Sequence, residues 1–298
     1  MQICFLYTVC STPVSCSSVC TSGPVFPDLS SCDESEEEDA FDTLVLGGLL
    51  SSGDFSASVE LITPNRTCIP WMDQLPVARG DAAASVLGSR IIYCGGIEDG
   101  QYQRSCHSYS LDLEGGEGWQ EEASMVLEKS GFGLSVIGDM LISSGGYGND
   151  GSLSSVEVFT LEEDMWRLEP RLEMGSTKYS HCSVAIRSWL YTIGGIVGGY
   201  YSDRVDAIDT SLLSDSITWV MKARMNEQRW ALGCHAGVFE GEEGIYVAGG
   251  RDGGADFLAS AEFYNLEADT WQPIGSLKTA RAYSRMTVLG GNFSVDCF

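Results

Sequence analysis

The chain has 298 residues, of which 44% are hydrophobic, and its formal net charge at pH 7 is −25. Such a negative field repels phosphate backbones, which argues against nucleic acid as a partner. No apolar stretch approaches the roughly 18 residues needed to cross a bilayer, so we expect no membrane span. The apolar content is sufficient for a large core, and the composition predicts a globular protein.

Residues 1–40 form a leader that is rich in Cys and Ser and ends in acidic residues. The run from Asp33 to Asp39 predicts a solvated linker without structure. The apolar stretch from Ile3 to Val9 could be part of a targeting segment, but the Lys or Arg that opens a signal peptide is missing. The same stretch could instead add a strand to an incomplete sheet. We expect a disordered or targeting leader, followed by one domain at 41–298.

The most informative pattern in this domain is a double glycine that follows an apolar run and precedes a tryptophan by 20 to 24 residues. It occurs five times, at intervals of about 50 residues, which is the mark of a repeat architecture. The pairs are Gly47-Gly48 with Trp71, Gly95-Gly96 with Trp119, Gly145-Gly146 with Trp166, Gly194-Gly195 with Trp219, and Gly249-Gly250 with Trp271.

Within one repeat the spacing of apolar residues predicts four short strands. In the unit around Gly145 these are residues 133–137, 140–144, 155–159 and 165–168. A tight turn joins the first two, and the third alternates polar and apolar residues. We therefore expect each unit to be a four-stranded antiparallel sheet. Its glycines would allow neighbouring sheets to approach closely, and its tryptophan would supply apolar area between them.

This arrangement resembles the kelch repeat, and the resemblance covers residues 41–298. A double glycine closes the second strand, a tryptophan opens the fourth, and a basic residue precedes the next unit. The resemblance implies an all-β fold, a kelch-type β-propeller with four-stranded blades around a central channel. Five repeats are recognisable. A monomer is expected.

The number of blades is open, because the repeats at the two ends of the domain are incomplete. In three units a basic residue lies 16 positions before the second-strand glycine, but the corresponding position before Gly47 is Ser31. At the other end, residues 283–289 and 293–295 supply a first strand and part of a second. Either a C-terminal strand completes the first blade of a five-bladed ring, or the chain is a fragment of a six-bladed ring.

Five basic residues recur at much the same place in successive units: Arg79, Lys129, Lys178, Arg229 and Arg281. Ring closure would gather them around one mouth of the channel. In kelch domains that bind acidic peptides, basic residues of the blades help to form the pocket, so the resemblance makes these five the candidates for binding an acidic segment. The structural alternative is that each caps a turn or packs along the neighbouring blade.

Eleven cysteines are many for this length. Cys94 and Cys106 lie on adjacent arms of one hairpin and come within disulfide reach if the register agrees, and Cys68 is another possible partner for either. Free buried thiols are the alternative. Two acceptor sequons, at Asn65 and Asn292, and the cysteine placement, which looks like that of secreted invertebrate kelch proteins, favour a secreted glycoprotein. A cytoplasmic location is the alternative.

The remaining candidates for chemistry are weak. His181-Cys182 and Cys234-His235 lie in first strands of neighbouring units, but alternation would send His and Cys to opposite faces, so we expect no metal site. We find no nucleophile elbow or phosphate-binding loop, and we expect no cofactor and no enzyme activity. His107 belongs to no motif.

The leading functional hypothesis is therefore a non-catalytic scaffold that binds a protein or peptide through loops on one face of the propeller. A first alternative is a fragment of an intracellular kelch substrate adaptor for a ubiquitin ligase. A second is a carbohydrate-active or oxidative enzyme built on a kelch propeller.

Overall fold

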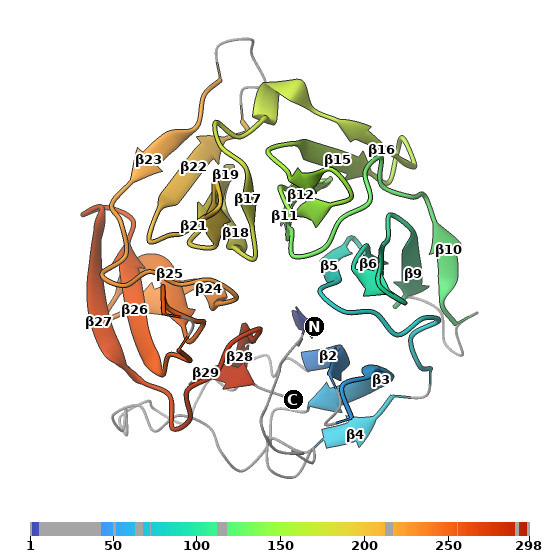
Figure 1. Ribbon diagram of the computed structural model, residues 1–298, viewed down its shortest axis with the longest axis horizontal. Coiled ribbons are helices and arrows are strands. Elements are labelled where there is room, and N and C mark those ends of the chain that lie inside the picture. The colour runs from blue at the N-terminus through green and yellow to red at the C-terminus, as the bar shows by residue number, and fades with distance from the viewer. Residues whose placement is uncertain are drawn as a thin grey trace, which may run out of the picture.

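In the computed structural model the chain forms β-sheets arranged around a central channel (Figure 1). The structure describes residues 2–5, 43–49, 52–62, 68–71, 73–111, 118–211, 217–254, 256–289 and 292–296. Among these residues no helix is long and apolar enough to span a membrane. The all-β, propeller-type architecture predicted from the repeats is confirmed.

Five sheets have four strands each, and we number them I to V in chain order. Sheet I contains β1 (Gln2–Phe5), β2 (Thr43–Leu49), β3 (Phe55–Ile62) and β4 (Cys68–Pro70). Sheet II contains β5 (Ala83–Leu87), β6 (Arg90–Cys94), β9 (Cys106–Ser110) and β10 (Gln120–Glu122). Sheet III contains β11 (Gly133–Ile137), β12 (Met140–Ser144), β15 (Val156–Thr160) and β16 (Met165–Leu168).

Two further four-stranded sheets and a two-stranded sheet complete the arrangement. Sheet IV contains β18 (Cys182–Ile186), β19 (Trp189–Ile193), β22 (Val205–Asp209) and β23 (Val220–Lys222). Sheet V contains β24 (Gly233–Phe239), β25 (Glu242–Ala248), β26 (Ser260–Asn265) and β27 (Thr270–Ser276). Sheet VI contains β28 (Arg285–Leu289) and β29 (Asn292–Asp296).

Short hairpins connect the second strand of a sheet to its third. They consist of β7 (Ile97–Glu98) with β8 (Gln101–Tyr102), β13 (Tyr147–Gly148) with β14 (Gly151–Ser152), and β20 (Ile196–Val197) with β21 (Tyr200–Tyr201). The last of these also pairs with β17 (Lys178–Tyr179), which leads into sheet IV. The single short 3₁₀ turn of the described chain, η1 (Pro170–Leu172), follows β16.

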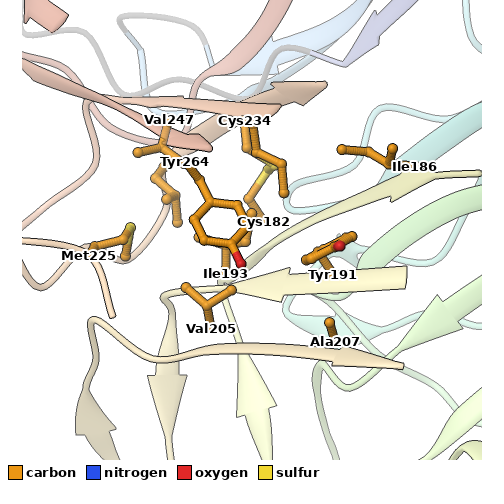
Figure 2. Packing of buried hydrophobic residues seen from close by; sticks show 12 residues of the cluster. Cys182, Ile186, Tyr191, Ile193, Val205, Ala207, Met225, Cys234, Val247 and Tyr264 are labelled. Atoms are coloured by element: carbon orange, nitrogen blue, oxygen red, sulfur yellow. A yellow bond between two sulfur atoms is a disulfide. The ribbon is translucent and has the colours of Figure 1, made fainter. Parts of the chain in front are cut away.

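The hydrophobic core lies between neighbouring sheets, so no sheet has a complete core of its own. Figure 2 shows one such cluster, in which Ile193 and Val205 of sheet IV pack with Val247 and Tyr264 of sheet V. Leu141 and Phe159 of sheet III likewise share a cluster with Ile92 of sheet II. Burial between sheets explains why the sequence repeats whole sheets, since each needs a neighbour to cover its face.

The double glycines connect each sheet to the next through the backbone. The first glycine donates its N–H to the carbonyl of a residue at the start of the third strand, and the second donates to the carbonyl of the basic residue that opens the next unit. The second set of bonds is Gly96 to Lys129 at 2.9 Å, Gly146 to Lys178 at 2.9 Å, Gly195 to Arg229 at 2.7 Å and Gly250 to Arg281 at 2.8 Å. All of these glycines have positive φ, which a residue with a side chain adopts only at a cost.

The tryptophans pack between sheets, as their spacing predicted. Trp166 is buried in the cluster that sheets II and III share, and Trp71 and Trp119 pack against the cluster of sheets I and II. Trp219 and Trp271 also donate their indole N–H to carbonyls of the preceding unit, those of Leu172 and Ala223, at 2.8 and 2.9 Å. The indoles therefore add a hydrogen bond between sheets to the apolar contact.

The innermost strands follow one another around the channel as β1, β5, β11, β18, β24 and β28, each in contact with the next, and β28 contacts β1 (Figure 1). The sequence left two closures open, a five-bladed ring whose first blade a C-terminal strand completes and a fragment of a six-bladed ring, and the pairing of the last strands bears on the first of them. The C-terminal strand β28 does not pair with β2; it pairs with β29 in a separate sheet. β1, which lies in the apolar stretch of the leader, pairs in parallel with β2. The acidic run at 33–39 lies outside the described residues.

Candidate functional site

The antiparallel connectivity of each sheet sorts the loops onto two faces. The second strand ends at the edge where the first begins, so the second-to-third connections and the entries into the first strands lie on the same face. We call this the hairpin face; it contains residues 95–105, 145–155, 194–204 and 249–259 and the entries at 79–82, 129–132, 178–181, 229–232 and 281–284. The opposite face, which we call the turn face, contains the short turns between first and second strands. One of these is the turn at Gly88, which lies close to Leu161, since an added Cβ at Gly88 would lie 3.3 Å from that side chain.

The recurrent basic residues lie beneath the hairpin face. Their exposed fractions are 4% for Arg79, 0% for Lys129, 1% for Lys178 and 0% for Arg229. Because these four charged groups are buried, they offer no exposed surface to a ligand. Their burial does not support the prediction that they bind an acidic segment. The geometry favours the structural alternative. Arg281 is half-buried and donates to the carbonyl of Thr279 at 3.3 Å.

Three of the basic residues form buried ion pairs with an acid on the third strand of their own sheet. The distances are 2.8 Å for Lys129 to Glu157, 2.9 Å for Lys178 to Asp206 and 3.2 Å for Arg229 to Glu262. Two of these acids also accept backbone N–H groups of the loop that precedes the basic residue, Glu157 from Val126 and Glu262 from Asn226. Each pair therefore holds the entry loop on the sheet, and the sequence had a signal for it, since Glu157, Asp206 and Glu262 occupy the same place in their units.

Sheet II varies this arrangement, because His107 replaces the acid. Arg79 donates instead to the Ser105 hydroxyl at 2.7 Å, to the Ser105 carbonyl at 3.1 Å and to Glu98 at 3.3 Å. Burial and the nearby Arg79 lower the pKa of His107. A neutral imidazole at this place avoids repulsion of the guanidinium.

Sheet I contains the acid, whereas the sequence has Ser31 at the position that corresponds to the basic residue. Glu60 lies on β3 at the place of Glu157 and Glu262, and its Oε2 is buried with no hydrogen-bond partner in the part of the chain that the structure describes. Burial raises the pKa of this carboxyl. Burial without a partner therefore disfavours the charged form of Glu60 in the folded state.

We expect Glu60→Gln to raise the thermal unfolding midpoint at pH 7. Because burial raises the pKa of Glu60 in the folded state, the free-energy cost of its charge is present above that pKa. The cost disappears as the pH falls, because the carboxyl group is then protonated in both the folded and the unfolded state. The gain should therefore shrink between pH 7 and pH 4, which calorimetry at the two values measures. Glu267→Gln, at an exposed position, is the control and should change little. An equal gain in the control would contradict this account.

A partial ring of backbone hydrogen bonds lines the channel mouth at the hairpin face. In five units the second residue after the basic one is left-handed, and in the last four of them its N–H donates to the carbonyl of its counterpart in the preceding unit. The bonds are Gly131 to Asp81 at 3.0 Å, Ser180 to Gly131 at 2.7 Å, Ala231 to Ser180 at 2.8 Å and Tyr283 to Ala231 at 2.7 Å. This ring fixes the relative positions of successive hairpins. Burial raises the pKa of Asp81 to about 6, an effect that the charge of Arg285 partly offsets.

The channel behind this mouth has a volume of about 260 Å³ and is lined by the inner strands. Its polar side chains include Ser135, which pairs with Ser183 at 2.8 Å, and His181, which lies 3.2 Å from the Ser144 hydroxyl. Burial holds the pKa of His181 well below its usual range, so its imidazole is neutral. Within the described residues no group of His, Cys, Asp and Glu has an arrangement that could hold a metal ion.

Among the described residues two cysteine pairs lie at disulfide distance. Cys94 and Cys106 are direct partners on β6 and β9, with their sulfur atoms 1.97 Å apart. The side chain of Cys68 lies outside the described residues. The second pair, Cys182 and Cys234, with sulfurs 2.02 Å apart, joins β18 to β24 across two sheets, and Figure 2 shows the bond. Sequence reasoning missed it, although a separation of 52 residues, about one repeat, is a signal for equivalent strands of adjacent sheets.

Aromatic side chains from successive hairpins and entry segments meet on the hairpin face, and we call them the aromatic collar. One series joins Tyr102 to Tyr147 and Tyr147 to Tyr179, with ring centroids 5.9 and 5.0 Å apart. A second joins Tyr201 to Trp230 and Trp230 to Tyr283, at 5.8 and 5.6 Å. The collar consists of Tyr102, Tyr147, Tyr179, Tyr201, Trp230, Phe257 and Tyr283.

The two series are continuous. Tyr179 and Tyr201 are both register partners of Ile196 in the three-stranded sheet of β17, β20 and β21. Directly opposed residues point to the same side of a sheet, so the two tyrosines flank one buried isoleucine. Burial raises the pKa of the Tyr179 phenol, with smaller contributions from Tyr147, Tyr201 and Tyr102.

Comparison with known proteins gives a consistent result. The Kelch motif family matches residues 233–278. Kelch-like protein 36 of Bos taurus is 25% identical over 272 residues, which cover 85% of this chain and 41% of the relative. Kelch-like protein 15 of Homo sapiens is 24% identical over 271 residues, 83% of this chain and 43% of the relative. Kelch-like protein 33 of Homo sapiens is 31% identical over 116 residues, 39% of this chain and 21% of the relative. The chain spans about two fifths of the length of the first two.

Proposed function

We propose that this chain, a kelch-repeat protein with a propeller fold, is a non-catalytic scaffold. It binds a protein or peptide through its hairpin face. In this function the chain acts as a monomer, and its rigid sheets position adaptable hairpins. The aromatic collar is the observation that carries it.

Exposure of the aromatic side chains on this face supports the proposal. The exposed fractions are 37% for Tyr147, 79% for Tyr200, 39% for Tyr201 and 41% for Phe257. Tyrosine and tryptophan are enriched among the residues that dominate the energy of protein interfaces, because a large rigid ring buries much area at a small entropic cost. A surface on which three hairpins present such rings is suited to an extended or looped partner segment.

The ionisable side chains beneath this face support a structural role and not a catalytic one. Lys129, Lys178 and Arg229 each neutralise a third-strand acid and hold an entry loop in place. A base or nucleophile needs access to a substrate, whereas these three side chains are buried.

A narrower form of the proposal is the substrate adaptor for a ubiquitin ligase, in which the hairpin face recognises the protein to be modified. The match to about two fifths of longer Kelch-like proteins supports it. The secreted and the cytoplasmic locations both stay predictions. The two cysteine pairs accord with an oxidising compartment, while the similarity to Kelch-like proteins accords with the adaptor.

The test selects peptides from a random library on the purified chain and measures their affinity for two sets of variants. The first set alters the hairpin face, one hairpin at a time: Tyr147→Ala, Tyr200→Ala and Phe257→Ala. The second alters exposed apolar residues elsewhere, Leu161→Ala at a turn and Met165→Ala on an outer strand, which are 40% and 54% exposed. We expect at least one hairpin-face variant to weaken binding about tenfold and the second set to leave it within about twofold. Selected peptides that lose affinity only with the second set would refute the proposal.

A further inference from the structure

Three tyrosines of the collar form a cluster that spans the hairpins of sheets II and III and the entry into sheet IV. The central ring, that of Tyr147, is inclined at 49° to Tyr102 and at 64° to Tyr179. At such angles the edge of one ring lies against the face of the next, and the Tyr147 ring, which is 37% exposed, keeps part of its surface open to solvent. The backbone holds this arrangement, because Tyr147 bridges to Ser130 and Tyr179 lies on β17. The cluster is thus placed by elements of three consecutive units.

The charge around this tyrosine cluster is negative. Its four surrounding segments, 97–104, 126–131, 147–153 and 177–180, contain the acids Glu98, Asp99, Glu128 and Asp150. Asp99, Glu128 and Asp150 are exposed. The same segments contain three basic residues. Lys129 and Lys178 are buried in ion pairs with acids of the third strands, and Arg104 is exposed, so three exposed acids stand against one exposed base. The exposed charge of the segments is therefore acidic, in a chain whose net charge is −25.

The other half of the collar shows how this face holds a cation. The guanidinium carbon of Arg251 lies 4.6 Å from the ring centroid of Phe257 and 5.4 Å from that of Trp230. A guanidinium over an aromatic face is attracted by the negative face of the ring, and this attraction increases when water is excluded. Arg251 belongs to the hairpin of sheet V, so that half of the collar is occupied by the chain's own cation.

We infer that the cluster of Tyr102, Tyr147 and Tyr179 receives an arginine or lysine side chain of a cationic partner peptide, whose neighbouring basic residues pair with Asp99, Glu128 and Asp150. This inference rests on the proposed function and defines the chemistry of the partner. It reverses the expectation of an acidic partner, since four of the five basic residues that suggested one are buried and the segments around the tyrosine cluster expose three carboxylates and one guanidinium.

Two contributions distinguish this partner from an apolar or a proline-rich one. The ring faces attract a cation with an energy that falls when the ring is replaced by an aliphatic side chain of similar size. The carboxylates add a long-range attraction that weakens as salt is added. A proline-rich segment would require the rings but not the carboxylates, and it would show little dependence on salt.

The test measures binding of three labelled 12-residue peptides by fluorescence anisotropy: one with alternating Arg and Gly, one with Glu in place of Arg, and one rich in proline without charge. We expect the cationic peptide to bind, and Tyr147→Leu to weaken its binding about tenfold while Tyr147→Phe keeps the affinity within about twofold. Because neither variant alters the net charge, this difference separates ring recognition from general attraction to an acidic protein. Asp150→Asn should reduce the dependence of affinity on salt.

Leu161→Ala, on the turn face, is the matched control and should leave binding of the cationic peptide unchanged. The inference is overturned if Tyr147→Leu binds as tightly as the original chain, or if the acidic or proline-rich peptide binds more tightly than the cationic one. In the second case the proposed function still stands when that binding depends on the hairpin face. Library peptides that bind independently of the hairpin face would refute both.

Discussion

Replacement of Lys129 by methionine is expected to destabilise the protein by about 3–5 kcal/mol, because it leaves the carboxylate of Glu157 buried without its counter-ion. Both side chains are fully buried, at 0% exposure, and their charged atoms lie 2.8 Å apart. Desolvation lowers the pKa of Lys129, and the charge of Glu157 opposes that shift. Urea denaturation at pH 7, followed by tryptophan fluorescence, measures the loss.

A second substitution separates the lost charge pair from the lost volume. Glu157→Gln in the Lys129→Met background should recover a large part of the stability, because an amide removes the unpaired charge while its oxygen still accepts the N–H groups of Val126 and Leu127. Lys278→Met, at an exposed position, should stay within about 0.5 kcal/mol of the original chain. If Lys129→Met were as mild as Lys278→Met, the buried pairs would not hold the entry loops as described.

Replacement of Gly145 by alanine is the second change with a large expected effect. An added Cβ would lie 2.9 Å from Met174 and even closer to the carbonyl oxygen of Lys178, which belongs to the entry of the next unit. That carbonyl accepts the N–H of Gly146, so it cannot move without loss of the bond between the sheets. We expect a cost of about 1–2 kcal/mol from the left-handed backbone and a further 1–3 kcal/mol from overpacking.

Gly138 provides the matched control for this substitution. Its φ of +61° nearly equals the +60° of Gly145, but an added Cβ would meet no atom within 4 Å. Gly138→Ala should therefore show the backbone cost alone, about 1–2 kcal/mol. The difference in unfolding free energy between the two variants, from urea denaturation, measures how tightly successive sheets are joined. Equal losses in both variants would show that the sheets tolerate separation at the glycine pair.

Local periodicity predicted the sheets well, because each repeat encodes strands and turns within about 50 residues. The first, second and fourth strands expected at 133–137, 140–144 and 165–168 agree with β11, β12 and β16, and the third differs by one residue. The glycine pairs and tryptophans could also be interpreted from sequence, since a position without Cβ and a large apolar ring serve the same contact in every unit.

Side-chain roles were harder to predict. The recurrence of Arg79, Lys129, Lys178 and Arg229 was visible, but recurrence alone does not distinguish residues that bind a ligand from buried residues that hold the entry loops. The aromatic collar was missed for a different reason. Its members occupy different positions in their units, such as Tyr102 at the end of one hairpin and Tyr147 at the start of the next, so no fixed spacing reveals them.

The sequence by itself determined the repeat, the strands within it and the residues that must be small or large where sheets meet, because these depend on local backbone preference and on apolar periodicity. Only the tertiary structure decided which charges are buried, which cysteines pair across sheets and which rings converge on the hairpin face. Those properties depend on distances between separate repeats, and such distances exist only after the sheets have packed around the channel.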